Sequence, residues 1–196
     1  MSTRKKLYAF IAVALAAAVL GGFFFARKSP QGDSLFAGPT PVFRAAPGAA
    51  AGTDIGLPSP RPPRAGYTEY QSATYHFSLF YPQGLNPGEY KEPGTAMTVT
   101  FDEPFNDRGF QVFVVPYGEE KITPERFKAD IPSGIIASST SILVDGVPAE
   151  AFYSFNRVLG DTYEVWFIYH GFLYEVTTYK AYDAWLGEIL STWKFL

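Results

Sequence analysis

Cysteine is absent from this chain, and histidine occurs only twice among its 196 residues. Without cysteine the protein forms no disulfide and no thiolate metal site, and it cannot carry a lipid on an N-terminal cysteine. Two histidines leave few arrangements for histidine-based nucleophilic catalysis. Neither one stands in a nucleophile-elbow motif.

Positive charge is scarce in the C-terminal two thirds of the chain. Residues 67–196 contain eight Lys and Arg against seventeen Asp and Glu, which leaves a net charge of −9. The basic residues are instead concentrated in the first 66 residues. Because phosphate groups need cationic partners, this acidic region is a poor candidate for binding nucleic acid or anionic lipid.

Residues 7–26 form one long apolar run, and Arg4, Lys5 and Lys6 stand directly before it. At about 1.5 Å per residue, a helix of this length crosses the roughly 30 Å hydrocarbon core of a bilayer once. A cleavable signal peptide is the alternative, but its small-residue pattern, at Ala16 and Ala18, falls in mid-span. We therefore predict an uncleaved, single-pass transmembrane helix.

The orientation of this helix follows from the charges beside it. Three cations precede it and two, Arg27 and Lys28, follow it. The positive-inside tendency then makes residues 1–6 a cytoplasmic basic head. We expect the protein in the cytoplasmic membrane, with everything after residue 26 on the extracytoplasmic side.

Residues 27–66 are a Pro/Gly/Ala-rich segment that holds eight of the sixteen prolines and six glycines. Such a composition cannot bury enough apolar surface to fold by itself. We predict a disordered tether, which as a coil spans roughly 35 Å.

Residues 67–196 are long enough for one globular domain with its own core. Strands are predicted at 75–81, 96–102 and 110–116, and successive strands joined by short turns from 136 to 180. The turns are indicated by Asp145-Gly146, Gly160-Asp161 and His170-Gly171.

Two helices complete the predicted domain. Thr123-Pro124-Glu125 has the cap, proline and acid typical of a helix start, and this helix should end before Pro132. Apolar residues from Tyr182 to Trp193 recur at helical spacing and predict a final helix that lies on the sheet.

Three segments of this domain resemble the PsbP-like family of extracytoplasmic domains. They are Phe77-Ser78-Leu79-Phe80-Tyr81-Pro82, Asp145-Gly146-Val147-Pro148-Ala149 and the closing Ile189-Leu190-Ser191-Thr192-Trp193-Lys194-Phe195. The resemblance implies an α+β fold in which helices sandwich an antiparallel sheet. It implies no catalytic residue and no cofactor, and the photosynthetic role of the best-known members is not carried over.

An acidic loop is the one candidate metal site. Asp102, Glu103 and Asp107 offer hard oxygen ligands of the kind that calcium prefers, although their spacing is not that of an EF-hand. The alternative is a solvated acidic loop.

Aromatic residues are dense in the domain, and some of them border predicted loops. Tyr67, Tyr70, Tyr90 and Tyr117 are the candidates for a surface that contacts a partner, whereas the periodic aromatics are expected in the core. His76 is predicted to be a strand residue and His170 a turn residue, each with a structural role.

These features together favour a binding or assembly accessory, held at the outer face of the membrane, with an envelope protein as its partner. No catalytic motif is present, which favours a binding role over an enzyme. The alternatives are a metal-dependent envelope hydrolase that uses Asp102 or a neighbouring acid, and a small-ligand-binding protein.

Overall fold

The computed structural model describes residues 61–196 apart from residues 105, 107, 134–135 and 157–158. No helix in this part of the chain is long and apolar enough to cross a membrane. The predicted head, transmembrane helix and most of the tether lie outside the described residues. Arg61, near the end of the predicted tether, already contacts the domain, because its Nε donates to Glu69 Oε1 at 2.6 Å.

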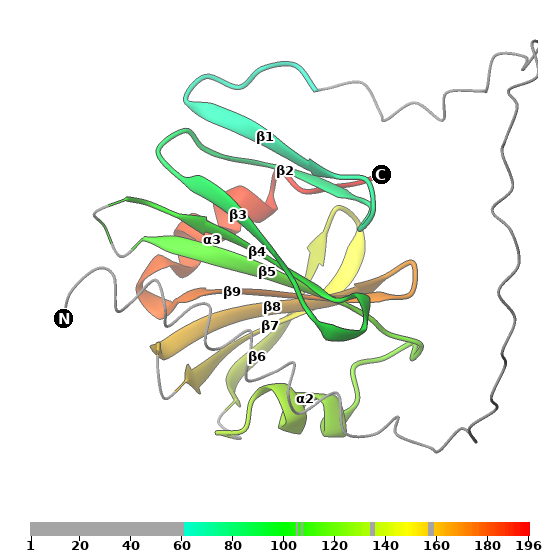
Figure 1. The fold of residues 1–196 in the computed structure, drawn as a ribbon. Coiled ribbons are helices and arrows are strands. Elements are labelled where there is room, and N and C mark those ends of the chain that lie inside the picture. Colours follow the sequence, from blue (N-terminus) through cyan, green and yellow to red (C-terminus); the bar gives the residue numbers. More distant parts are fainter. Residues whose placement is uncertain (1–60, 105, 107, 134–135, 157–158) are drawn as a thin grey trace, which may run out of the picture.

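The centre of the domain is a seven-stranded antiparallel sheet with the strand order β3-β4-β5-β9-β8-β7-β6 (Figure 1). A second, three-stranded sheet has the order β1-β2-β10. The bounds of the strands are β1 Tyr67–Ser72, β2 Phe77–Pro82, β3 Asn86–Lys91, β4 Met97–Asp102, β5 Gly109–Pro116, β6 Ile136–Val144, β7 Val147–Asn156, β8 Gly160–Tyr169, β9 Phe172–Tyr179 and β10 Lys194–Phe195.

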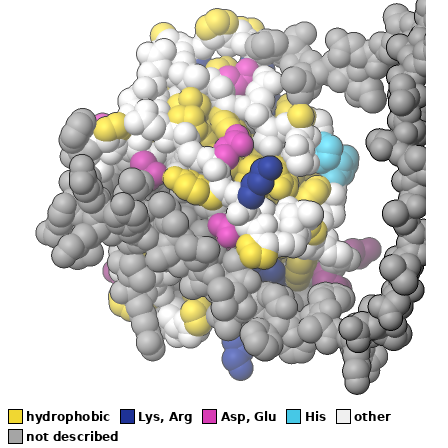
Figure 2. Space-filling model, viewed as in Figure 1, with side chains coloured by type: hydrophobic (Ala, Val, Ile, Leu, Met, Phe, Trp, Pro, Cys, Tyr) yellow, Lys and Arg dark blue, Asp and Glu magenta, His cyan; other side chains and the backbone are white. Residues whose placement is uncertain are grey.

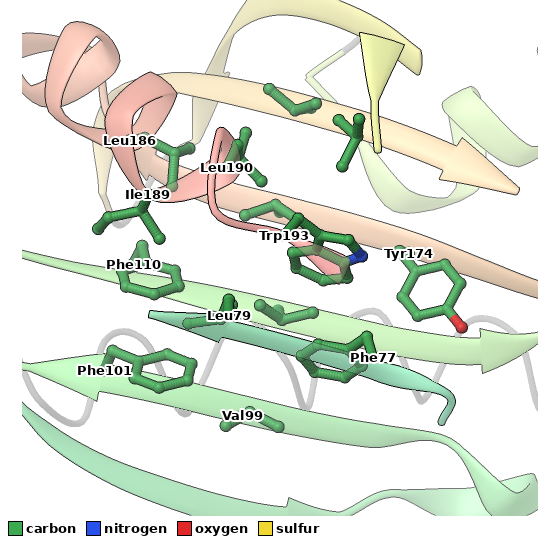
Figure 3. Close-up of a cluster of buried hydrophobic side chains, with 14 of the residues drawn as sticks. Phe77, Leu79, Val99, Phe101, Phe110, Tyr174, Leu186, Ile189, Leu190 and Trp193 are labelled. Atoms are coloured by element: carbon green, nitrogen blue, oxygen red, sulfur yellow. The ribbon is translucent and has the colours of Figure 1, made fainter. Parts of the chain in front are cut away.

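The main core lies between one face of the large sheet and a layer made of α3 (Asp183–Leu190) and the small sheet. Phe77 of β2 stacks on Trp193 with ring centroids 4.5 Å apart. From α3, Leu186 and Ile189 point into the same cluster (Figure 3). Burial of these large rings supplies the hydrophobic driving force that joins the two layers.

The opposite face of the large sheet is covered in part by α2, which runs from Pro124 to Asp130. Phe127 of this helix stacks on Trp166 of β8 with ring centroids 4.9 Å apart. Thr123 caps the helix, because its side chain accepts a hydrogen bond from the backbone N–H of Arg126. The predicted start of α2 and its end before Pro132 are confirmed.

The predicted antiparallel sheet is confirmed, but the layers around it differ from the expected pair of helical layers. On one side, much of the covering layer is the small sheet and only part of it is α3. The last helix is also shorter than predicted, since α3 ends at Leu190 and Trp193 follows it after the turn at Ser191-Thr192. Trp193 reaches the core from the approach to β10.

One predicted strand began too early. Tyr75 and His76 belong to the turn between β1 and β2, and β2 starts at Phe77. His76 has φ 52°, a left-handed conformation that an extended strand does not contain. The prediction that His76 is a strand residue was therefore wrong.

Candidate functional site

Two of the three predicted acidic-loop carboxylates, Asp102 and Glu103, belong to residues that the structure describes. Glu103 forms a salt bridge with Arg108, whose Nη2 lies 3.0 Å from Glu103 Oε2. Asn106 also donates to that carboxylate at 3.1 Å. Asp102 is the last residue of β4. Burial raises the pKa of its carboxyl group, and a hydrogen bond with Thr100 offsets part of this effect.

Asp107, the third candidate, lies outside the described residues. Among the described residues, no group of three His, Asp or Glu side chains is placed to hold a metal ion. Arg108 and Asn106 both engage Glu103 Oε2, and the guanidinium charge beside this carboxylate disfavours a second cation there. The calcium site stays a prediction from the sequence.

The four candidate tyrosines do not form one surface. Tyr70 is only 8% exposed and donates its hydroxyl proton to Glu89 at 2.8 Å, so the expectation that it lies at the surface was wrong. Tyr67 is half-buried in β1, and the guanidinium of Arg64 lies 4.2 Å above its ring. Tyr90 is half-buried in β3.

Tyr117 has a role inside the domain. Its ring packs against the cluster beneath α2. Its hydroxyl donates to the carbonyl of Lys121 at 3.2 Å and accepts from the N–H of Thr123 at 3.1 Å. These bonds fix the loop that leads into α2, and they give Tyr117 a structural role that the sequence pattern did not indicate.

Two glutamates are buried on the α2 side of the large sheet. Glu175 of β9 accepts a hydrogen bond from Arg126 Nη2 at 2.9 Å, and Arg126 also pairs with Asp130. Burial raises the pKa of Glu175 well above its ordinary value, and the negative charge of Asp130 raises it further. One guanidinium thus serves two carboxyl groups, and it links α2 to the sheet.

The second buried glutamate, Glu164 of β8, is surrounded by hydroxyl groups. Thr177 donates to it at 2.6 Å, Thr162 at 2.8 Å and Ser154 at 3.0 Å. Burial raises the pKa of Glu164, although these donors act in the opposite direction. Because both oxygens accept hydrogen bonds from the protein, we assign Glu164 to the structure of the sheet and not to chemistry on a substrate.

Six aromatic and imidazole rings gather at one end of the domain, and we call them the end cluster. In the structure they form an unbroken series of ring contacts, with centroid separations from 3.9 to 6.3 Å. Five of the six rings are half-buried and one is exposed. The members are Tyr75, His76, Tyr169, His170, Phe172 and Phe195.

Three separate segments build the end cluster. Two rings come from the turn between β1 and β2, three from the turn between β8 and β9 and its flanking strands, and one from β10. Figure 1 shows both turns and the C-terminal strand on the same side of the domain. This side is opposite to Tyr67, where the chain enters β1, because β1 runs from Tyr67 towards the turn that holds the first two rings.

Backbone hydrogen bonds hold these segments together. The N–H of Leu196 donates to the carbonyl of His76 at 2.9 Å, and the N–H of Tyr117 donates to the carbonyl of Gly171 at 2.7 Å. Asp145 fixes β10, because its carboxylate accepts from the N–H of Phe195 at 3.0 Å and pairs with Lys194. These contacts hold the backbone of the end cluster, and its rings pack against one another on that backbone.

Sequence reasoning missed the end cluster. No sequence spacing brings residues 76 and 170 together. One part of the end cluster could be predicted, because His170-Gly171 indicates a turn and the structure has an exposed turn there.

Comparison with known proteins identifies the fold of the domain but gives no activity. No family model matches the chain, and no curated protein matches it in sequence. Among solved structures, the chain is similar to the solution structure of cyanobacterial PsbP (CyanoP) from Synechocystis sp. PCC 6803. The match has a TM-score of 0.50 at 13% sequence identity and covers 72% of this chain and 99% of that chain. At this identity the likeness shows a PsbP-like fold and nothing about partners.

Proposed function

We propose that this protein is a membrane-anchored, extracytoplasmic accessory whose PsbP-like domain binds an envelope protein through the end cluster. The observation that carries the proposal is the end cluster itself. Partly exposed aromatic rings, carried on segments that backbone hydrogen bonds anchor, have the composition of binding hot spots. A surface ordered in advance also loses little conformational entropy on binding.

The position of the end cluster agrees with a tethered binding domain. The predicted tether joins the domain before β1, and the end cluster lies at the far end of β1. A domain attached in this way presents the end cluster away from its attachment point. Tether length then sets how far from the bilayer a partner can be reached.

The proposed topology can be tested separately from binding. A reporter enzyme that is active only outside the cytoplasm is fused after Leu196, and a second copy of the chain carries the same reporter without residues 1–26. Activity of the first fusion and inactivity of the second are expected. Activity of neither fusion would place the domain in the cytoplasm and contradict the proposal.

The binding role is tested by photo-crosslinking in cells, with the full chain carrying a photoreactive residue at position 169 or at position 155. Phe155 is the matched control, since its side chain is 40% exposed and lies near the β7–β8 connection, at the other end of β8. We expect one envelope protein, the same in replicate experiments, to crosslink at position 169 and not at position 155.

A substitution adds a second readout to this experiment. Tyr169→Ala should reduce co-purification of that protein at least tenfold, because loss of one hot-spot residue typically costs about 2 kcal/mol of binding free energy. Phe155→Ala should leave co-purification unchanged. Equal crosslinking from both positions, or equal co-purification of both variants, would remove the end cluster from the proposal.

A further inference from the structure

We infer that His76 and His170 form a two-histidine site for a borderline divalent transition-metal ion such as Zn²⁺, Ni²⁺ or Cu²⁺. These are the only two histidines in the chain, and the fold brings their ring centroids to 6.0 Å with an angle of 67° between the ring planes. Histidine side chains lie at the surface in Figure 2. The inference rests on this geometry and does not depend on the proposed partner.

The distance between the rings suits one shared ion. Zinc binds imidazole nitrogen at about 2.0–2.1 Å, so two imidazoles on one tetrahedral ion have centroids about 5–6 Å apart. The observed separation of 6.0 Å lies at the upper end of this range.

The ring nitrogens of both histidines are available to a ligand. Within the described residues, no hydrogen bond or ion pair engages a ring nitrogen of His76 or His170. His170 is exposed and His76 is half-buried. Lone pairs without a protein partner at a surface are what a metal ion in solution can reach.

The backbone of each histidine holds it in an unusual conformation. His76 has φ 52° and His170 has φ 46°, in the left-handed region that costs most residues about 1–2 kcal/mol. Glycine would occupy these turn positions without that cost. Both rings are also supported from the side, since Tyr169 stacks on His170 at 4.1 Å and Phe172 lies 6.3 Å from His76.

The two imidazole ligands limit which metal ions the site can bind. Two imidazoles favour borderline ions over Ca²⁺ and Mg²⁺, which prefer oxygen ligands. No third His, Asp or Glu joins the pair among the described residues, so water fills the other positions around the ion. Such an open, two-ligand site binds more weakly than a closed structural zinc site and exchanges its ion. The net charge of −9 over residues 67–196 favours the approach of a cation.

The test uses the full chain in detergent, without a histidine tag, with its histidine rings labelled with ¹⁵N. Because the chain has two histidines, the ring spectrum contains two sets of resonances, which report on the site directly. Addition of Zn²⁺ should move both sets together with a single midpoint and a stoichiometry of one ion per chain. Addition of Ca²⁺ should move neither set.

The variants His76→Asn and His170→Asn remove one ligand each. Asparagine accepts positive φ better than most residues, so each turn is retained. Each variant should weaken Zn²⁺ binding at least tenfold, and the histidine that is left should no longer respond at the wild-type midpoint. Asp102→Asn, in the acidic loop, is the control and should leave the midpoint unchanged.

Three results would overturn the inference. They are two rings that titrate with separate midpoints, rings that do not respond up to about 1 mM Zn²⁺, and a midpoint that is unchanged in either histidine variant. Because no partner is present, failure of this test leaves the crosslinking result of the end cluster intact.

Discussion

The two faces of the large sheet are both covered by a second layer, but different kinds of side chain hold each layer to the sheet. On the α3 side, stacked and edge-on aromatic rings such as Phe77, Trp193 and Phe167 fill the space between layers. On the α2 side, a smaller apolar cluster lies beside two buried glutamates, and Arg126 joins helix to sheet. The first layer is held mainly by burial of apolar area, and the second partly by charge.

This difference gives the two layers different responses to solution conditions. Apolar packing is nearly independent of pH, whereas carboxyl groups with raised pKa values bind protons in the folded state before they do so in the unfolded state. We therefore expect the α3 side to set the overall stability of the domain and the α2 side to set its pH dependence.

The largest effect is expected from Trp193→Ala, on the α3 side. Trp193 is 1% exposed and contacts the rings of Phe77 and Phe167. Its truncation leaves a cavity that should lower the free energy of unfolding by about 3–5 kcal/mol, equally at pH 5 and pH 7. Urea unfolding of the full chain, followed by circular dichroism, measures this loss.

The control for this substitution is Leu143→Ala. Leu143 is 71% exposed, so its truncation should change the free energy of unfolding by less than about 0.5 kcal/mol. If the two variants were equally stable, Trp193 would contribute no more to the main core than an exposed side chain does.

A smaller effect that depends on pH is expected from Arg126→Met, on the α2 side. The substitution leaves Glu175 and Asp130 near each other without their cation. Breaking a buried ion pair costs about 3–5 kcal/mol, and the partial exposure of Arg126 reduces the expected loss at pH 7 to about 2–3 kcal/mol. The loss should shrink at pH 5, because protonation removes the unpaired negative charge.

Thr123→Ala separates charge from simple loosening of α2. It removes the helix cap and should cost about 1 kcal/mol at both pH values, since the cap does not titrate. The contrary result is that Arg126→Met lowers the free energy of unfolding equally at pH 5 and pH 7. That result would mean that the arginine acts through its aliphatic stem and not through its charge.

The parts of the fold that could be predicted from sequence are those with strong local patterns. Strands β4 and β5 have buried side chains along almost their whole length, and the cap of α2 is visible in Thr123-Pro124-Glu125. Strand β3 was missed because it contains Pro87 and Gly88, which by propensity indicate a turn. These residues fit there because β3 is an edge strand, where one side of the backbone needs no partner strand.

The end cluster depends on tertiary arrangement and could not be predicted in the same way. His76 and His170 meet because two hairpin turns end at the same side of the domain. Sequence alone shows two turn-compatible histidines, and only the stacking of the small sheet on the large one brings them into contact. Tyr70 shows the reverse error, because its position near a predicted loop concealed the strand β1 that buries it.

The smallest effect in the comparison is expected from Glu175→Gln. This substitution should change how steeply the free energy of unfolding varies with pH. Burial and the charge of Asp130 raise the pKa of Glu175, so the folded wild-type protein takes up this proton at higher pH than the unfolded chain. Wild-type stability should therefore rise as the pH falls from 7 towards the ordinary carboxyl pKa near 4.5. In the variant this rise should be reduced, and stability at pH 7 should equal or exceed that of the wild type by up to about 1 kcal/mol.

Below this range both proteins should lose stability together. The hydrogen bond from Tyr153 lowers the pKa of Asp183, so its contribution is present above the ordinary pKa of 3.8 and is lost as the pH falls through the lowered value. Glu188→Gln, on the exposed side of α3, is the control and should keep the wild-type slope. Urea unfolding at intervals between pH 3 and pH 8 measures all three curves. A Glu175→Gln curve parallel to that of the wild type would assign the pH dependence to groups other than Glu175.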